Sequence, residues 1–256
     1  NMRKAIRIFS KTPIALAAFF RARKGKKIIA PKKNLSFSEN FFYMCFEKVP
    51  SKEIVKAFDV SLILYAEHSF NVSTFTARTI TSSLSDIHGA ITGAIASLKG
   101  PLHGGANEEV MHMMNKIKKP ENALKWINKA LKNKDVVMGF GHRVYKRGDS
   151  RVPTMEKYFK KVASIKKDKK FIKIYDIVKN VMIERKNIHP NVDYPTGPTY
   201  HLMGFDTDFF TPIFVISRIT GWSAHIMEQH AANKLIRPLS KYSGEKHRKV
   251  MLLNQR

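Results

Sequence analysis

The sequence predicts a mainly α-helical protein. Apolar residues recur every three to four positions along most of the chain, whereas the alternating pattern of a half-buried strand is scarce. Glycine and proline gather in the joints between these periodic stretches, where helices end. A chain of 256 residues with 43% hydrophobic content can bury one sizeable core, or two lobes that share a cleft.

The first expected helix opens the chain. The stretch NMRKAIRIFSKTPIALAAFF, residues 1–20, has the spacing of an amphipathic helix. Its basic, apolar start resembles a signal peptide, but Phe20, Arg21 and Arg23 offer no small-residue cleavage site. Because the chain opens at Asn1, within a helical pattern, we expect that it lacks its natural N-terminus and that a targeting peptide is not visible.

The segment between Ser51 and His68 is expected to form the next helix, with Ser51 as its N-cap. Its apolar stripe comprises Ile54, Phe58, Leu62 and Tyr65 or Ala66. A last helix is expected to open at Thr211 as N-cap, with Pro212 in the first helical position.

A long apolar helix is expected from Phe75 to Leu98. Its stripe comprises Leu84, Ile87, Ile91, Ile95 and Leu98. The stop signal KGP at residues 99–101 would end it.

Short apolar runs and a single cysteine limit where the protein works. The longest runs, TPIALAAFF and TPIFVI, fall well short of the roughly 18–20 residues that a membrane span needs. Cys45 has no cysteine partner, which excludes an intrachain disulfide and a metal site built from cysteines. We therefore expect no membrane partner, no bound metal, and a reducing, cytoplasmic location.

The charge is strongly basic, with 46 Lys and Arg against 20 Asp and Glu and a formal net charge of +26. Such a balance suits nucleic acid, an anionic membrane surface or polyanionic small substrates. Most lysines lie in residues 115–135 and 157–187, between apolar residues at helical intervals. This spacing favours the solvated outer faces of amphipathic helices over a nucleic-acid groove.

Three joints carry side chains of catalytic type. They are His103 in GPLHGGAN, His142 in GFGHRVYKRGDSR and Asp193 in HPNVDYPTGPTYH. Flanking glycines let a ligand approach the backbone, and the first joint leads into a helix N-terminus, whose amides favour anions. A single histidine beside glycine is more often a capping residue, but three such groups at element ends indicate a site.

The chain as a whole resembles the citrate synthase family, in a bacterial-type branch. Five motifs fall in the family's order and approximate spacing: LYAEHSFNVSTFTAR, GPLHGGANEEV, GFGHRVYK followed by Arg151, NVD with a downstream TPIFVISRITGW, and NKLIRPLSKYSG. The resemblance covers essentially all 256 residues and implies that an N-terminal part of the large domain is missing. The segment DYPTGPTYHLMG resembles the branch that includes 2-methylcitrate synthases and bifunctional enzymes.

The resemblance implies an acyltransferase that converts the acyl group into an alkyl group on transfer. It would condense acetyl-CoA, propionyl-CoA or both with oxaloacetate and hydrolyse the thioester to citrate or 2-methylcitrate. Asp193 matches the base, His103 the donor to the thioester oxygen, and His142 the group that polarises the oxaloacetate carbonyl. One methylene changes binding by only about 1–3 kcal/mol, so both acyl chains stay open.

The family also supplies a set of substrate-binding residues. His68, Arg151 and Arg218 would hold the oxaloacetate carboxylates, and Arg237 would reach in from a partner subunit. A buried salt bridge to Asp or Glu is the alternative for Arg218, which lies in an apolar helix segment. The residues expected at CoA are Gly139, Gly141, Arg143 and Lys146. This chain has Asp-Ser-Arg at residues 149–151 where many relatives have Asp-Pro-Arg, which keeps the arginine but loses a rigid joint.

The fold implied by the resemblance has two helical domains with the active site in the cleft between them. The large domain would comprise residues 1–104 and 204–256, and the small domain residues 105–203, with His103 at the hinge. Closure would exclude water from the enolate. A homodimer is implied by Arg237 and by the apolar helix from Phe75 to Leu98. Acyl-CoA enters as a co-substrate, with no bound cofactor.

Two alternatives stay open. The chain could be a catalytically silent basic remnant that binds nucleic acid or other polyanions, in which case its binding would be salt-sensitive. It could also carry the site residues yet be too incomplete to turn over.

Overall fold

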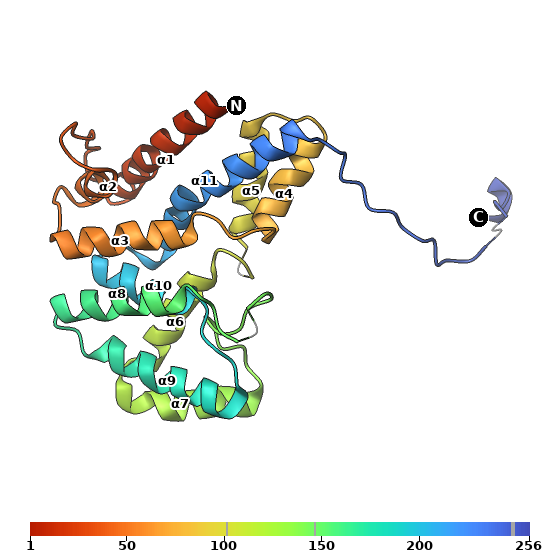
Figure 1. Ribbon diagram of the computed structural model, residues 1–256. Helices are drawn as coiled ribbons and strands as arrows, with labels where there is room; N and C mark the ends of the chain where they lie inside the picture. The colour runs from red at the N-terminus through yellow and green to blue at the C-terminus, as the bar shows by residue number, and fades with distance from the viewer. Residues whose placement is uncertain (101, 146, 247–248) are drawn as a thin grey trace.

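The computed structural model describes residues 1–100, 102–145, 147–246 and 249–256 (Figure 1). The described residues form α-helices with two short 3-10 helices, and they contain one isolated β-bridge, between Phe140 and Pro190, but no strand. The predicted mainly α class is confirmed. The α-helices are α1 (Met2–Ala22), α2 (Phe37–Phe46), α3 (Lys52–Tyr65), α4 (Val72–Ser82), α5 (Ile87–Leu98), α6 (Ala106–Ile117), α7 (Pro120–Asn133), α8 (Val152–Ile165), α9 (Lys170–Lys186), α10 (Asp193–Met203) and α11 (Phe210–Ala231). The 3-10 helices are η1 (Thr207–Phe209) and η2 (Leu253–Gln255).

Side-chain caps explain where several helices begin. The Ser36 hydroxyl accepts the Glu39 N–H while the Glu39 carboxylate accepts the Ser36 N–H, which starts α2 with a capping box. Asn71 caps α4 by accepting the Thr74 N–H. Ser51 stands at the N-cap of α3 as predicted, but no hydrogen bond joins its side chain to the helix N-terminus.

The expected single helix from Phe75 to Leu98 is wrong, because the segment folds into two helices, α4 and α5, which pack side by side (Figure 1). Between them Leu84 adopts a left-handed φ of 66° and is 73% exposed, so it leaves the apolar stripe. The Asp86 side chain accepts the Gly89 N–H and starts a new helix there. Helix α5 ends at Leu98 as expected, whereas Pro101 of the stop signal lies outside the described residues.

Helix α11 begins earlier than predicted. Its first residue is Phe210, directly after η1, so Thr211 and Pro212 lie in the first turn. The Thr211 N–H donates to the Glu108 carboxylate of α6 at 2.9 Å. The Glu108 carboxylate, from another helix, therefore caps the start of α11 in place of the Thr211 side chain.

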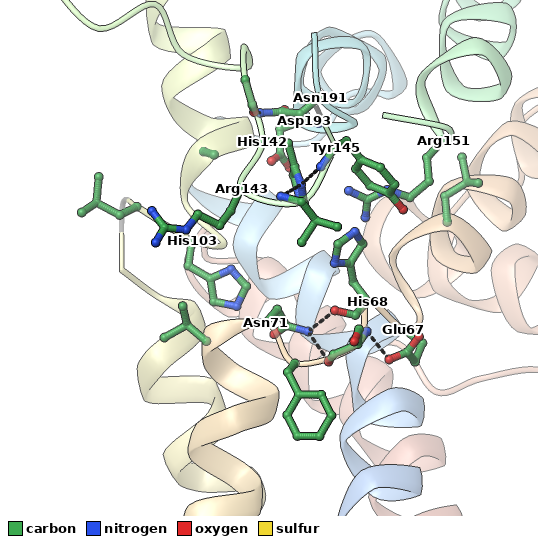
Figure 2. A pocket seen from close by; sticks show the side chains of 18 of the residues that line it. Glu67, His68, Asn71, His103, His142, Arg143, Tyr145, Arg151, Asn191 and Asp193 are labelled. Atoms are coloured by element: carbon green, nitrogen blue, oxygen red, sulfur yellow. Dashed lines mark hydrogen bonds between the residues drawn. The ribbon is translucent and has the colours of Figure 1, made fainter. Parts of the chain in front are cut away.

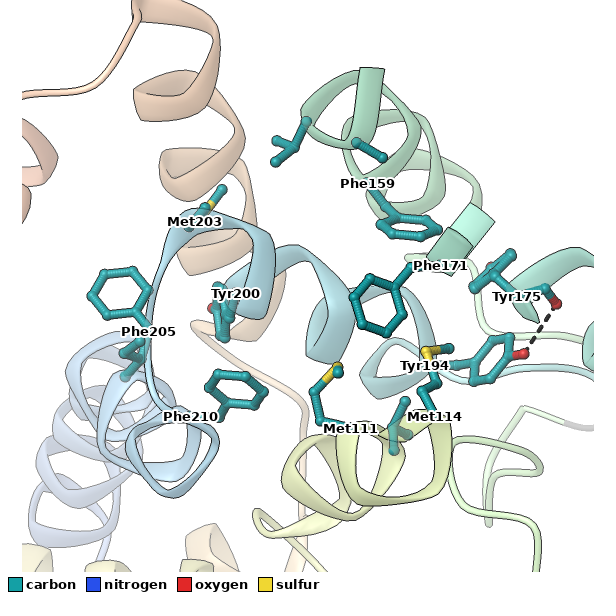
Figure 3. Close-up of a cluster of buried hydrophobic side chains, with 14 of the residues drawn as sticks. Met111, Met114, Phe159, Phe171, Tyr175, Tyr194, Tyr200, Met203, Phe205 and Phe210 are labelled. Atoms are coloured by element: carbon teal, nitrogen blue, oxygen red, sulfur yellow. Dashed lines mark hydrogen bonds between the residues drawn. The ribbon is translucent and has the colours of Figure 1, made fainter. Parts of the chain in front are cut away.

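Two apolar clusters form the core. One gathers the phenylalanines of α2, α3 and the α10–α11 connection and continues through α6, α7, α8 and α9. Figure 3 shows this continuity, with Tyr200 and Phe210 at one end, Phe159 and Phe171 toward the other, and Met111 of α6 below. The second cluster packs α4 and α5 against α11. Helix α10 packs on both α6 and α8, which fixes its start beside the loop that precedes α6.

The lysines of α7 lie on its outer face, as the spacing predicted. Ala123, Ile127 and Ala130 are buried, whereas Lys125 and Lys129 are exposed. No helix in the described part of the chain is long and apolar enough to cross a membrane. Cys45 lies on α2 and is buried in the core, where burial raises its pKa to about 12.

Candidate active site

A cavity of about 810 Å³ lies where four segments meet (Figure 2). They are the connection from α3 to α4, the loop before α6, residues 141–151, and the start of α10. In Figure 2, His142, Arg151 and Asp193 come from one side of the cavity and His68 and His103 from the other. His68 and Asp193, 125 positions apart in the sequence, are thereby brought to one site.

Most of the predicted site residues line this cavity. They are His68, His103, Gly141, His142, Arg143, Arg151 and Asp193. Arg218 is buried in α11, near enough for its charge to act on His68, His103 and Asp193. Gly139 does not line the cavity and lies against Val110 and Tyr194, and Lys146 lies outside the described residues. Arg237 lies in the extended segment after α11, which runs away from the body, so the structure does not bring it to the cavity (Figure 1).

The imidazole of His103 is held in one tautomer by Ser73. Its Nε2 lies 3.3 Å from the Ser73 backbone nitrogen and 2.8 Å from the Ser73 hydroxyl. A backbone N–H can only donate, so Nε2 accepts and Nδ1 carries the proton. Trp222 donates to the same hydroxyl at 3.1 Å and fixes it in turn. Burial, with Arg218 nearby, lowers the pKa of His103 to about 4 and keeps the ring neutral at pH 7.

The ring of His142 is fixed by its own loop. Its Nδ1 accepts the backbone N–H groups of Val144 at 3.1 Å and Tyr145 at 3.2 Å, so Nε2 carries the proton. Burial lowers the pKa of His142 as well. The His68 ring stands edge-on to it, with 4.9 Å between centroids. The two histidines are neutral hydrogen-bonding groups at neutral pH.

Asp193 is the first residue of α10. It keeps some exposed surface where it lines the cavity, while protein encloses the carboxylate. Its Oδ1 accepts the Tyr65 hydroxyl at 2.5 Å, and its backbone N–H donates to the Asn191 side chain at 3.1 Å. Burial raises the pKa of Asp193 to about 6, against the opposing hydrogen bond from Tyr65. A carboxylate with a pKa close to neutral can take a proton from a weak carbon acid more readily than an ordinary one.

The Arg151 guanidinium forms a salt bridge with the fully buried carboxylate of Asp149. Its Nε donates to Asp149 Oδ1 at 2.9 Å, and its NH2 donates to Asp149 Oδ2 at 2.7 Å. The same carboxylate accepts the Val192 N–H at 3.0 Å, next to Asp193. Asp149 therefore ties residues 147–151 to the start of α10, and its two hydrogen bonds hold Arg151 although the residue between them is Ser150 rather than a rigid proline.

Arg218 is a buried cation without an acidic partner. It is 1% exposed, its Nε donates to the Tyr65 carbonyl at 2.6 Å, and its guanidinium stacks 4.7 Å from the Phe214 ring centroid. Among the described residues no carboxylate forms a salt bridge with it, and its NH1 has no hydrogen-bond partner. The alternative of a buried salt bridge is wrong. An unpaired buried charge is costly, which indicates a place for an anion.

Two of the glycines are required by the backbone. Gly139 and Gly141 have φ of 83° and 77°, a region that other residues rarely adopt. A Cβ on Gly139 would lie 2.7 Å from Val110 and 2.9 Å from Tyr194. The loop that carries His142 can follow this path only because these positions lack side chains.

The sequence did not point to Ser73 or Asp149 as site residues, and it placed Tyr65 only in an apolar stripe. A signal for Tyr65 was available: a tyrosine on a buried helix face needs a partner for its hydroxyl, and His68 follows three residues later. For Ser73 no comparable signal exists, since its partner lies 30 residues further along.

Sequence comparisons place the chain among known enzymes. The family model described as the C-terminal domain of citrate synthase matches residues 1–239. The chain is 55% identical over 254 residues to 2-methylcitrate synthase 2 of Corynebacterium glutamicum, covering 97% of this chain and 66% of that protein. It is 53% identical to the 2-methylcitrate synthase of Mycobacterium tuberculosis, with 97% and 63% covered, and 44% identical to citrate synthase 2 of Bacillus subtilis, with 100% and 69% covered. The chain thus spans about two thirds of the length of these relatives.

Solved structures give the same answer. The citrate synthase of Thermotoga maritima superposes with a TM-score of 0.90 at 39% identity, over 99% of this chain and 70% of that one. The citrate synthase of Thermoplasma acidophilum, in its ternary complex with carboxymethyl coenzyme A and oxaloacetate, superposes with a TM-score of 0.90 at 34% identity, over 98% and 68%. The chain belongs to the citrate synthase family.

Proposed function

We propose that the whole protein condenses acetyl-CoA or propionyl-CoA with oxaloacetate and hydrolyses the thioester to release citrate or 2-methylcitrate and CoA. The observation that carries the proposal is the meeting, in one cavity, of Asp193, the neutral donor His103 and Arg151, with the charge of the buried, unpaired Arg218 close enough to act on the first two. Relatives named for each of the two reactions match the chain, which supports either acyl substrate.

In the proposed first step Asp193 removes a proton from the α-carbon of the acyl group. Its Oδ1 is occupied by Tyr65, so Oδ2 is the oxygen that takes the proton. The electron pair moves onto the thioester oxygen, where His103 Nδ1–H donates a hydrogen bond to the enolate. A neutral donor in a site sheltered from bulk water stabilises such an oxyanion strongly.

In the second step the enolate carbon attacks the oxaloacetate carbonyl. His142 would donate its Nε2–H to that oxygen as the bond forms and protonate it. Water then hydrolyses the thioester. The tautomers set by Ser73 and by the 142–145 turn supply both donors without a proton rearrangement.

The oxaloacetate carboxylates would lie against Arg151, Arg218 and His68. Arg218 NH1 and His68 Nε2 are buried without hydrogen-bond partners, so a dianion would satisfy both. Planar guanidinium groups bind carboxylates bidentately, as Arg151 already binds Asp149.

CoA would lie along the loop of Gly139, Gly141 and Arg143, with Lys146 next to it in sequence.

We further propose a homodimer in which Arg237 of one copy completes the site of the other. The extended segment after α11, which exposes Leu235 and Leu239, supports this proposal. The division into domains at residues 1–104, 105–203 and 204–256 and a cytoplasmic location complete the proposal. None of the relatives named above supports the nucleic-acid alternative.

Thiol release tests the proposal. The whole protein is given acetyl-CoA or propionyl-CoA, each with and without oxaloacetate, and free CoA is counted. We expect release only when both substrates are present, and loss of release in His103→Ala and Asp193→Asn. Release that does not need oxaloacetate, or full activity in Asp193→Asn, would contradict the assigned roles.

A further inference from the structure

We propose that the Tyr65 hydroxyl is a positioning group for the Asp193 carboxylate, fixing which oxygen meets the substrate and keeping that carboxylate ionised. This inference rests on the function proposed above. It assigns a role to a residue that stands outside the three catalytic side chains.

The Tyr65 ring cannot move freely. It closes α3 and is 1% exposed, and it packs edge-on against Phe214 of α11 with 4.3 Å between centroids. Its backbone carbonyl accepts Arg218 Nε at 2.6 Å. The ring and its backbone are thus both fixed to α11, the helix that carries the unpaired guanidinium.

The Tyr65 hydroxyl reaches from α3 to the first residue of α10. It donates to Asp193 Oδ1 at 2.5 Å, and no other hydrogen bond from the described residues reaches that carboxylate. Burial, together with the Asp193 charge, raises the pKa of Tyr65 well above its usual value, so the hydroxyl stays a donor at every working pH. With Oδ1 held, Oδ2 is left for the α-carbon proton.

The hydrogen bond also opposes the effect of burial on Asp193. Burial raises the pKa of the carboxyl to about 6, and the Tyr65 hydroxyl is the first group that lowers it. The other charges that face the carboxylate are Arg151 and Arg218, which also lower its pKa, and Asp149, which raises it. Without the hydroxyl, only Arg151 and Arg218 would stabilise the negative charge of Asp193. Arg151 is already hydrogen-bonded to Asp149, and Arg218 to the Tyr65 carbonyl.

Replacing Tyr65 by Phe in the whole protein tests this role. The acid limb of kcat/KM against pH reports the ionisation of the base in the free enzyme. We expect Tyr65→Phe to move that limb upward by about one pH unit, a roughly tenfold tighter hold on the proton, with much of the lost rate recovered above pH 8.

Tyr200→Phe is the matched control. Tyr200 is also buried, and it lies on α10, but its hydroxyl donates to Ser61 at 3.0 Å rather than to Asp193. We expect its acid limb to stay in place. A Tyr65→Phe enzyme that loses the same fraction of its rate at every pH, with an unmoved limb, would overturn the proposal and leave Tyr65 a packing residue.

A second variant covers the case in which Tyr65→Phe does not fold. Tyrosines replaced throughout by 3-fluorotyrosine carry a more acidic donor, and the acid limb should then move downward; an unmoved limb would overturn the proposal. If the unaltered protein releases no CoA, it is the proposed function that fails. The Asp193 carboxyl carbon, followed by carbon-13 NMR in unaltered and Tyr65→Phe protein, still measures the role of the hydroxyl.

Discussion

At the scale of single residues, the site combines a carboxylate that titrates near neutral pH with imidazoles that stay uncharged there. Burial raises the pKa of Asp193 to about 6 and lowers that of His103 to about 4. Near neutral pH the base is therefore mostly ionised while the donor is uncharged. This is the pairing that proton removal next to a thioester requires.

The pH dependence of kcat/KM follows from that separation. As the pH falls through 6, Asp193 takes a proton and can no longer act as a base, so kcat/KM should drop tenfold per pH unit between about pH 5.5 and 4.5. His68 and His103 have pKa values of about 4, so each imidazole takes up its proton only below that range. Initial rates in buffers of constant ionic strength measure the slope. An acid limb of kcat/KM with its midpoint near pH 4 would show that the Asp193 carboxylate is not buried as the structure indicates.

Asp193→Asn should make the protein more stable at neutral pH. The carboxyl of Asp193 ionises near 3.8 when unfolded and near 6 when folded, so the folded state binds more protons between these values and its stability falls as the pH rises. Removing the charge should raise the free energy of unfolding by about 2 kcal/mol at pH 7, after a discount for water in the cavity.

Urea unfolding at two pH values checks this effect. The gain should nearly vanish at pH 3.5, where the folded carboxyl is protonated and the unfolded one is mostly protonated. Asp176→Asn, a change of the same kind at a half-buried carboxylate of α9 that pairs with Lys160 at 3.3 Å, serves as the control and should bring no gain. Equal gains at both pH values would point to packing rather than ionisation.

Sequence reasoning reached the chemical groups of the site but not their supports. His103, His142 and Asp193 stand in glycine-rich or proline-rich joints, and such joints are visible in a single sequence. Ser73 and Tyr65 act through contacts that only packing creates, 30 and 128 residues away along the chain. A serine in a helix is ordinary by itself, so nothing in the sequence marks Ser73.

At the scale of elements, the close contact of α10 with α6 sets the distance between the proposed base, Asp193, and the proposed enolate donor, His103. A Cβ on Gly197 would lie 2.7 Å from the Asn107 carbonyl and 3.4 Å from Val110. The two helices approach this closely because position 197 has no side chain. Helix α10 starts at Asp193, and the loop before α6 carries His103.

Gly197→Ala should therefore push the helices apart and weaken the enzyme. We expect a loss of about 1–3 kcal/mol in the free energy of unfolding, as for other overpacked sites, and a lower kcat. Thermal unfolding and steady-state rates measure the two effects.

Gly89→Ala is the control, because that glycine is exposed and its Cβ would meet only side-chain atoms, the Ser85 hydroxyl at 3.0 Å, which can rotate away, and Asp86 Oδ1 at an ordinary 3.6 Å. Alanine is the better helix former there, so stability should hold or rise slightly. A Gly197→Ala protein as stable as the control would mean that α6 and α10 tolerate a wider spacing.

The helix that divides into α4 and α5 shows why element boundaries are harder to predict than element type. The apolar stripe runs through the break without interruption, and neither glycine nor proline marks it. What ends α4 is the left-handed turn at Leu84, followed by the Asp86 cap. A cap of this kind competes with helix propagation only when the two helices can pack against each other.

At the scale of the whole molecule, the excess of positive charge matches the substrates proposed for the site. The exposed lysines of α7 and α9 are solvated, and few of them pair with carboxylates. A net charge of +26 creates a positive potential that attracts anions such as acyl-CoA and a dicarboxylate.

The rate of capture should therefore depend on salt. Raising KCl from 20 to 200 mM shortens the screening length from above 20 Å to below 10 Å, and kcat/KM should fall about two- to tenfold while kcat changes little. Sucrose at matched viscosity is the control for slower diffusion. If kcat/KM does not change with salt, the positive electrostatic potential of the protein does not speed substrate association.

The one thiol of this chain has a practical consequence. Cys45 is buried, and with a pKa of about 12 almost none of it is thiolate at neutral pH. A disulfide reagent that counts released CoA would therefore register product from the first seconds without a protein background from this position. For the same reason, a cysteine introduced on an exposed helix face would accept a fluorophore at a single place without first removing the native thiol, so that fluorescence could follow whether the proposed domains move.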